Sequence, residues 1–294
     1  MAGSQDFAPD PRNADLRIWL NGALVRRAEA RVSVFDAGFV LGDGIWEGLR
    51  LHKERLLFLE AHLDRLFRGA ASIGLELPPR RYFEDALAET LAANGMVDGA
   101  HLRLMVTRGE KAAANQDPRN AFGVPTVVIL AEYKQPTPGM TLRLHTASIR
   151  TTSAQMFDMR INSHSRLPLI LALNEAIAAG ADEALMLDPA GNIASCNATN
   201  FFWVTGGEVR TSSGEFCFNG VTRANAIALC RANGIALGQG DYPPGDLLSA
   251  SEAFVTGTFG GVTPVSEIDG RRLEPGPMTA RLRSLYEDLK DADR

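Results

Sequence analysis

Two glycine-containing segments offer the hydrogen-bond donors that a bound phosphate needs. Asn219-Gly-Val-Thr-Arg223 stands directly before a predicted helix, where the first backbone N–H groups lack helical partners and the helix dipole attracts an anion. Thr256-Gly-Thr-Phe-Gly-Gly261 follows a predicted strand and again combines backbone N–H groups with hydroxyls. With an arginine on a helix face, the two segments would suit one phosphate, whereas the alternative for the first is an ordinary helix start. Neither a Walker A nor a dinucleotide-binding fingerprint follows a strand, so those two kinds of site are not predicted.

Lysine is scarce in this chain, and its scarcity limits the covalent chemistry that is available. Only Lys53, Lys111, Lys134 and Lys290 occur among 30 basic residues, so the stretch between Lys134 and Lys290 holds none. An imine with an aldehyde requires an amine, and arginine stays protonated and cannot act as that nucleophile. His164 is the only histidine in the predicted loop 150–166 and is therefore a candidate proton carrier.

The elements that must position these residues follow from periodicity and from turn residues. Apolar residues recur at helical spacing over 59–73. Asn21-Gly22 predicts a type I′ turn that joins two short strands in a hairpin. The further predicted helices are 80–94, 168–180, 222–233, 246–250 and 277–290. The further predicted strands are 31–35, 100–108, 124–132, 141–149, 183–188, 200–204 and 253–257.

A proline- and glycine-containing stretch, Lys134-Gln-Pro-Thr-Pro-Gly139, is the best candidate for a domain linker. It divides the chain into an N-terminal domain (1–133), a linker (134–140) and a C-terminal domain (141–294). Strands and helices are mixed without strict alternation, and this pattern favours two α+β domains over one doubly wound sheet.

Composition excludes several classes of protein. With 45% apolar and 22% charged residues, the chain is typical of a folded globular protein. A net charge of −5 argues against a nucleic-acid partner, and no apolar run is long enough to predict a membrane partner. Three cysteines without metal-ligand spacing predict neither a metal site nor a disulfide framework. We therefore expect a cytoplasmic protein.

A set of motifs in order along the chain resembles the class IV aminotransferases, the fold type IV group of pyridoxal phosphate enzymes. The group includes branched-chain and D-amino acid aminotransferases, (R)-amine transaminases and aminodeoxychorismate lyase. The motifs are Phe39-Val-Leu-Gly-Asp-Gly-Ile-Trp-Glu-Gly48, His62-Leu-Asp-Arg-Leu66, Ala181-Asp-Glu-Ala-Leu185, Asn219-Gly-Val-Thr-Arg223 and Ser251-Glu-Ala-Phe-Val-Thr-Gly-Thr258. The resemblance implies a two-domain fold with pyridoxal phosphate between the domains, a homodimer, and an amino acid or amine with its keto acid as substrate.

The same resemblance assigns the residues that hold the cofactor phosphate. Arg65 matches the arginine that grips it, Val221 and Thr222 match donors at a helix start, and Gly257 and Thr258 match a second loop. A guanidinium fork suits a phosphate dianion. The alternative for Arg65 is a surface ion pair with Asp64 or Glu60 of its own helix.

Two positions depart from the family pattern. The imine-forming lysine is expected in the loop before the 168–180 helix, where Arg160 or Arg166 stands instead. The glutamate expected against the cofactor ring nitrogen is replaced by Ser195, followed by Asn197 in the same segment. A serine hydroxyl holds no charge and cannot keep that nitrogen protonated as a carboxylate does. Covalent attachment of pyridoxal phosphate is therefore not expected.

Three hypotheses about function remain open from the sequence. In the first, the protein is an aminotransferase-like enzyme that holds its cofactor without a covalent bond and uses His164 to move protons. In the second, the fold performs another reaction on an anionic ligand, with the pocket lined by Ser163, His164, Ser165, Cys196 and Asn197. In the third, the protein binds pyridoxal phosphate or a related phosphate without catalysis.

Overall fold

The computed structural model describes residues 3–293, which divide into two compact units. The N-terminal unit comprises residues 8–135 together with 161–166, and the C-terminal unit comprises residues 3–7, 136–160 and 167–293. Segment 161–166 thus belongs to the N-terminal unit, although the sequence suggested a domain that runs unbroken from residue 141. The reason is a local pairing with a strand of that unit, described below.

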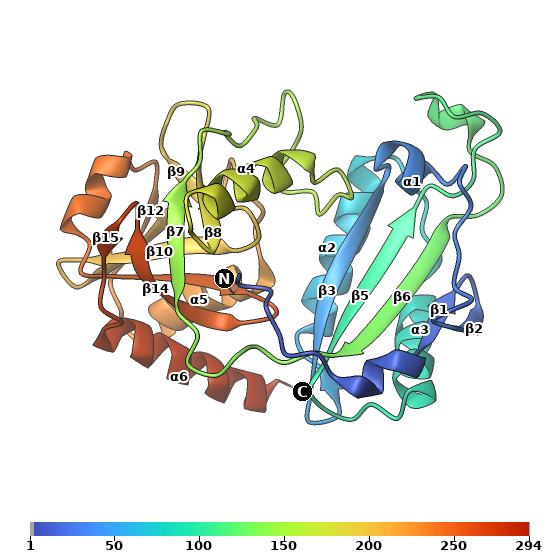
Figure 1. Cartoon of the computed structure of the whole chain (residues 1–294), viewed down its shortest axis with the longest axis horizontal. Coiled ribbons are helices and arrows are strands. Elements are labelled where there is room, and N and C mark those ends of the chain that lie inside the picture. Colours follow the sequence, from blue (N-terminus) through green and yellow to red (C-terminus); the bar gives the residue numbers. More distant parts are fainter. Residues whose placement is uncertain (1–2, 294) are drawn as a thin grey trace. The chain divides into compact units, whose positions relative to one another are not determined.

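The N-terminal unit contains one antiparallel sheet in the order β2-β1-β6-β5-β3-β4, in which β3, β5 and β6 run side by side (Figure 1). The strands are β1 (Arg17–Leu20), β2 (Ala23–Arg26), β3 (Gly44–His52), β4 (Arg55–Leu56), β5 (Ala100–Thr107) and β6 (Thr126–Tyr133). The helices are α1 (Ala37–Leu41), α2 (Leu59–Ser72) and α3 (Arg80–Ala93), with the 3-10 turns η1 (Pro11–Asp15) and η2 (Pro118–Asn120).

The core of this unit forms where α2 and α3 cover the sheet. Leu63, Leu66 and Ala70 recur at helical spacing on α2 and are buried, as are Phe83 and Leu87 on α3. The sequence periodicity therefore identified the buried face of α2. The predicted hairpin turn is also confirmed, because β1 and β2 pair in antiparallel register around Asn21 and Gly22.

One predicted strand of this unit is wrong. Residues 31–35 alternate in apolar character, but they form loop and turn rather than a strand. Val32 and Val34 are both exposed, so the alternating apolar side chains of this segment do not pack into a core. Asp36 then caps α1, a helix that the sequence did not predict.

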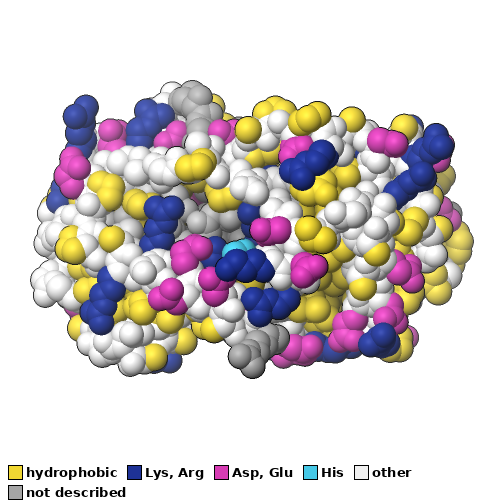
Figure 2. All heavy atoms as spheres, turned by 90° about the horizontal axis from the view of Figure 1, so that it is seen from below, with side chains coloured by type: hydrophobic (Ala, Val, Ile, Leu, Met, Phe, Trp, Pro, Cys, Tyr) yellow, Lys and Arg dark blue, Asp and Glu magenta, His cyan; other side chains and the backbone are white. Residues whose placement is uncertain are grey.

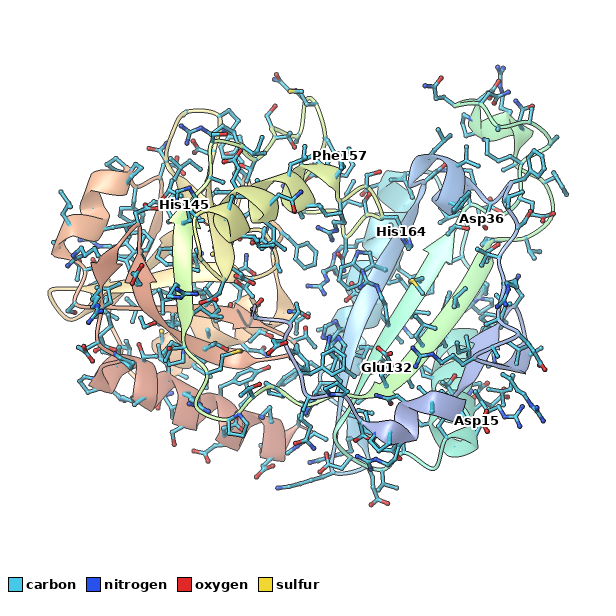
Figure 3. All side chains as sticks on the ribbon, in the orientation of Figure 1. Asp15, Asp36, Glu132, His145, Phe157 and His164 are labelled. Atoms are coloured by element: carbon cyan, nitrogen blue, oxygen red, sulfur yellow. The ribbon has the colours of Figure 1, made fainter. Side chains whose placement is uncertain are left out.

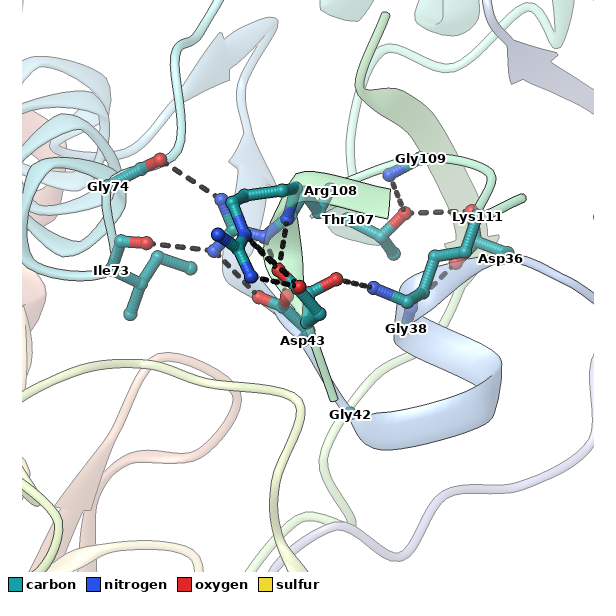
Figure 4. A network of polar contacts seen from close by, with 12 residues as sticks. Asp36, Gly38, Gly42, Asp43, Ile73, Gly74, Thr107, Arg108, Gly109 and Lys111 are labelled. Carbon is teal, nitrogen blue, oxygen red and sulfur yellow. Dashed lines mark hydrogen bonds and ion pairs between the residues drawn. The ribbon is translucent and has the colours of Figure 1, made fainter. Parts of the chain in front are cut away.

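A polar network anchors α1 near the first residues of β3 (Figure 4). Asp36 accepts a hydrogen bond from the Thr107 hydroxyl at 2.8 Å, which ties the start of α1 to the end of β5. Arg108 donates to both carboxylate oxygens of Asp43, at 2.6 and 3.0 Å, and to two backbone carbonyls just after α2. The start of β3 is consequently held from two sides.

The C-terminal unit contains a nine-stranded mixed sheet in the order β12-β11-β10-β13-β14-β7-β8-β9, with β15 paired to β14. The strands are β7 (Leu142–Thr146), β8 (Glu183–Leu187), β9 (Ile193–Cys196), β10 (Asn200–Thr205), β11 (Glu208–Ser212), β12 (Leu237–Gly240), β13 (Glu252–Gly257), β14 (Gly261–Ile268) and β15 (Arg271–Arg272). The helices are α4 (Leu167–Ala178), α5 (Val221–Ala232) and α6 (Pro277–Ala292), with the 3-10 helix η3 (Pro244–Ser249).

Strand β8 is buried along its whole length because both of its faces are covered. Ala184 and Met186 pack in a cluster with α4, which lies across β7 and β8 in Figure 1. Leu185 and Leu187 belong to the other core cluster of this unit. The longer predicted helices of both units are confirmed to within two residues at each end, and the short one at 246–250 is a 3-10 helix.

Candidate functional site

In the C-terminal unit, Asn200 joins the start of α5 to the end of β13. Its side-chain amide donates to the Phe218 carbonyl at 2.6 Å, and its carbonyl oxygen accepts from the Gly220 N–H at 3.2 Å. Asn200 also lies opposite Thr256 in the pairing of β10 with β13. A Cβ atom at position 220 would lie 2.6 Å from the Asn200 side-chain oxygen, so this close approach favours glycine. Two segments far apart in sequence are thereby brought together.

The start of α5 offers backbone N–H donors that are not capped by a side chain. Gly220 is the N-cap and provides no side-chain hydrogen bond to the first helical N–H groups, which include those of Val221 and Thr222. The buried Thr222 hydroxyl lies 3.5 Å from the Tyr286 hydroxyl. The Thr256 hydroxyl is buried without a hydrogen-bond partner among residues 3–293. Gly257 and Thr258 follow it directly, so the predicted donors of this unit converge on one region.

Ser195 extends this region along β9. Its hydroxyl donates to the Thr199 carbonyl at 2.8 Å and accepts from the Asn200 amide at 3.1 Å. Asn197 is engaged differently, because its side-chain oxygen accepts from the Ala184 N–H at 2.8 Å and supports the turn between β9 and β10. Burial raises the pKa of the adjacent Cys196 thiol well above its usual value, so the thiol is protonated at neutral pH.

In the N-terminal unit, Arg65 on α2 faces Glu47 on β3. The guanidinium donates to both oxygens of this carboxylate, at 2.8 and 2.5 Å, and His62 lies 2.7 Å from the same carboxylate. The predicted alternative partners on its own helix, Glu60 and Asp64, instead pair with an arginine of α3. Burial would raise the pKa of Glu47, but Arg65 and His62 outweigh it and lower that pKa. The sequence suggested no role for His62, and for Glu47 only that it matches a pocket-facing position of the family, although both lie in family motifs.

Segment 161–166 pairs with the first residues of β3 through backbone hydrogen bonds and one isolated bridge. The Trp46 N–H donates to the Asn162 carbonyl at 2.9 Å, and the His164 N–H donates to the Gly44 carbonyl at 2.9 Å. Ser163 forms an isolated bridge with Ile45. This pairing explains why the segment belongs to the N-terminal unit and why its side chains have defined places.

The two arginines proposed for the lysine position have different surroundings. Arg160 is half exposed and forms an ion pair with Asp158 at 2.8 Å. Arg166 is partly buried, donates to the Asn162 side-chain oxygen and lies 5.3 Å from the centre of the Trp46 ring. Burial lowers the pKa of Arg166 to about 10, with nearby arginines contributing, so it remains a cation at neutral pH. Neither guanidinium can form an imine.

His164 lies beside the first residues of β3 and is labelled in Figure 3. Its Nε2 lies 3.1 Å from the Ile45 carbonyl, an oxygen that can only accept, so Nε2 carries a proton. Burial lowers the pKa of His164, and Arg103 contributes in the same direction. The ring is thus neutral at pH 7, with Nδ1 as the nitrogen able to take a proton.

These residues fit one end of pyridoxal phosphate and not the other. The α5 start and the buried Thr256 hydroxyl offer donors suited to a phosphate. No lysine stands in 161–166, and Ser195 provides no carboxylate for the ring nitrogen.

Among residues 3–293 there is no group of three His, Cys, Asp or Glu residues that could hold a metal ion. In the same part of the chain, no helix is both long and apolar enough to cross a bilayer.

Comparison with known proteins identifies the family. The family Amino-transferase class IV matches residues 44–268. The branched-chain-amino-acid aminotransferase-like protein 2 of Arabidopsis thaliana is 38% identical over 96% of this chain, but the chain spans only 52% of that relative. A putative branched-chain-amino-acid aminotransferase of Methanocaldococcus jannaschii is 34% identical, with 94% of this chain and 96% of the relative covered.

A solved structure agrees with this assignment. A branched-chain amino acid aminotransferase from T.th., complexed with N-(5'-phosphopyridoxyl)-L-glutamate, superposes with a TM-score of 0.86 at 30% identity, covering 96% of each chain. The resemblance and the fold type IV prediction are both confirmed. The chain belongs to the class IV aminotransferase family.

Proposed function

We propose that the protein binds a pyridoxal phosphate-type cofactor through its phosphate, without a covalent bond, and acts on an amino acid or amine and its keto acid. One pair of observations supports the proposal: no side chain caps the first N–H groups of α5, and segment 161–166 contains no lysine. When bound, such a cofactor supplies an aldehyde and an electron-accepting ring for chemistry at an amine.

The residues of this chain have separate roles in the proposal. The N–H groups of Val221 and Thr222 bind phosphate oxygens, and Gly257 and Thr258 add donors from the loop after β13. Arg65 contributes a guanidinium, oriented by its two hydrogen bonds to Glu47. These contacts neutralise the phosphate charge and fix the orientation of the ligand.

Proton transfer is assigned to His164 in the proposal. Its Nε2 proton is held by the Ile45 carbonyl, so Nδ1 accepts a proton and returns it. Ser195 carries no charge and its hydroxyl already donates to the Thr199 carbonyl, so it would not keep the cofactor ring nitrogen protonated as a carboxylate would. We therefore expect slow turnover.

The substrate class rests on the relatives. Both relatives are described as branched-chain-amino-acid aminotransferases or as like them, and the solved structure holds a phosphopyridoxyl-glutamate. The names of both relatives and the ligand of the solved structure all refer to amino acids. We therefore propose an α-amino acid and a 2-oxo acid as the first substrates to assay.

Borohydride reduction with peptide mass spectrometry tests the proposal. Protein incubated with pyridoxal phosphate should show a higher melting temperature, and after reduction it should carry no adduct on any residue from 135 to 289. Arg166→Lys is the matched control, because it supplies an amine and should acquire an adduct at that position. An adduct on the unmodified chain in that range would overturn the non-covalent assignment.

Two other outcomes select the alternatives. If pyridoxal phosphate raises the melting temperature but no amino donor changes its absorbance spectrum, the protein is a binder without catalysis. If pyridoxal phosphate leaves the melting temperature unchanged, the fold serves another anionic ligand, and the cofactor assignment fails.

A homodimer and a cytoplasmic location complete the proposal. The apolar side chains of Val34, Phe39 and Val124 are 68%, 71% and 74% exposed, and backbone contacts join segments 32–41 and 110–124. An exposed apolar patch of this kind favours self-association, which sedimentation velocity measures.

The three cysteines are buried free thiols, as a reducing compartment would keep them. Basic and acidic side chains are interspersed on the face in Figure 2, which does not favour a nucleic-acid partner.

A further inference from the structure

Trp46 on β3 brings two guanidinium groups into one place. Arg103 on β5 lies 3.8 Å above the ring centre, and Arg166 lies 5.3 Å from it. The ring itself is fixed, because its Nε1 donates to the Ser163 carbonyl at 3.2 Å. A guanidinium gains energy over an indole face, so this arrangement holds both cations against the same side chain.

More positive than negative charge surrounds Arg166. The positive charges of Arg103 and Arg65 disfavour the charged form of Arg166, and the negative charge of Glu47 favours it. Glu47 already accepts two hydrogen bonds from Arg65 and one contact from His62. An anion that arrives beside Arg166 therefore relieves repulsion between cations in a partly buried place, where charges interact strongly.

Arg166 is also oriented before any ligand binds. Asn162 accepts from its guanidinium, and the Asn162 amide donates to the Trp46 carbonyl at 2.5 Å. The Asn162 carbonyl receives the Trp46 N–H, so the asparagine is tied to β3 at both its backbone and its side chain. A planar guanidinium held in this way presents a fork that matches the two oxygens of a carboxylate.

We propose that Arg166, assisted by Arg103, binds the oxyanion of a small organic acid in the region where the family carries its lysine. The substitution thus exchanges a nucleophile for an anion receptor. This inference rests on the proposed function only in the assignment of that region, and it requires no cofactor. Carboxylate and phosphate groups share the necessary chemistry, and the experiment separates them.

Isothermal titration of cofactor-free protein tests the proposal, with 4-methyl-2-oxopentanoate in one arm and inorganic phosphate in the other. Arg166→Gln should weaken binding of the carboxylate by about tenfold or more, because a hydrogen-bonded charged donor is lost. Arg103→Gln should weaken it by a smaller factor, about threefold, since Arg103 acts mainly by charge. Loss confined to the phosphate arm would contradict a receptor for a small organic acid, because binding of the carboxylate would then not depend on Arg166.

Arg119→Gln is the matched control, because Arg119 is 87% exposed and pairs with Asp117 in a surface loop. Equal binding by the Arg166→Gln variant and the unmodified protein in both arms would overturn the inference, as would an equal loss in the control. If Arg166→Gln does not fold, Arg166→Lys keeps the charge without the fork and should show an intermediate loss. Failure of the proposed function would appear separately, as absence of any response to pyridoxal phosphate.

Discussion

Glu183 is a buried carboxyl group that should make the protein less stable as the pH rises. It lies on β8, is 1% exposed and accepts hydrogen bonds from the Ser4 hydroxyl and from the Thr199 hydroxyl at 2.6 Å. Burial raises the pKa of Glu183 from 4.5 to about 7, although these hydrogen bonds lower it. Between these two pH values the folded state keeps a proton that the unfolded state has lost.

The sign and size of the effect follow from this difference. The stabilisation is fully present below pH 4.5 and is lost as the pH rises through the folded-state value of about 7. A difference of this size corresponds to about 3 kcal/mol, taken as an upper bound because the buried network can relax. Glu183→Gln keeps the shape and remains neutral, so it should remove this dependence.

Urea unfolding from pH 4.5 to 8, followed by far-ultraviolet circular dichroism, measures the effect. The free energy of unfolding should fall by up to about 3 kcal/mol more in the unmodified protein than in the Glu183→Gln variant. Glu175→Gln is the control, because the Ser148 hydroxyl lowers the pKa of Glu175 and the contribution of that carboxylate is lost only as the pH falls. Parallel pH profiles for the unmodified protein and the Glu183→Gln variant would refute the reasoning.

Three further predictions concern groups of the two units. Glu47→Gln should lower the free energy of unfolding by about 3 kcal/mol, because Arg65 is left without its buried carboxylate, and urea unfolding that shows no change would contradict this. Burial lowers the pKa of His101 to about 3, so its contribution to stability is present above pH 6.5 and is lost as the pH falls toward 3. His101→Gln should flatten this acid-side loss, and an unaltered acid-unfolding curve would count against the assignment. Asn200→Ala should weaken inorganic phosphate binding by about tenfold in calorimetry, because two hydrogen bonds to the loop before α5 are lost, and unchanged affinity would contradict the site.

Much of the local structure followed from the sequence because its causes are local. The apolar spacing on α2 predicted both its limits and its buried face. Asn21-Gly22 predicted the hairpin because these two residues tolerate positive φ angles, which are 49° and 91° in the structure. Strand β14 was not predicted, because Pro264 within it disfavours a strand by local rules, whereas pairing with β13 and β7 stabilises it.

The candidate site divides in the same way. The sequence by itself determined that no lysine lies between positions 134 and 290 and that serine stands at 195, since these are matters of composition and order. It left Arg160 and Arg166 as equal candidates for the lysine position. Only the tertiary structure separated their surroundings, by pairing segment 161–166 with β3 and placing Arg166 beside Trp46.

The contacts that the sequence could not predict are all long-range. Glu47 meets His62 and Arg65, and Asn200 joins Gly220 to Thr256, although each pair is separated by many residues and by whole elements. Periodicity reports which face of an element is buried, but not which polar group of another element meets it there. That choice depends on how strands pair and helices pack, and therefore only the folded chain decides it.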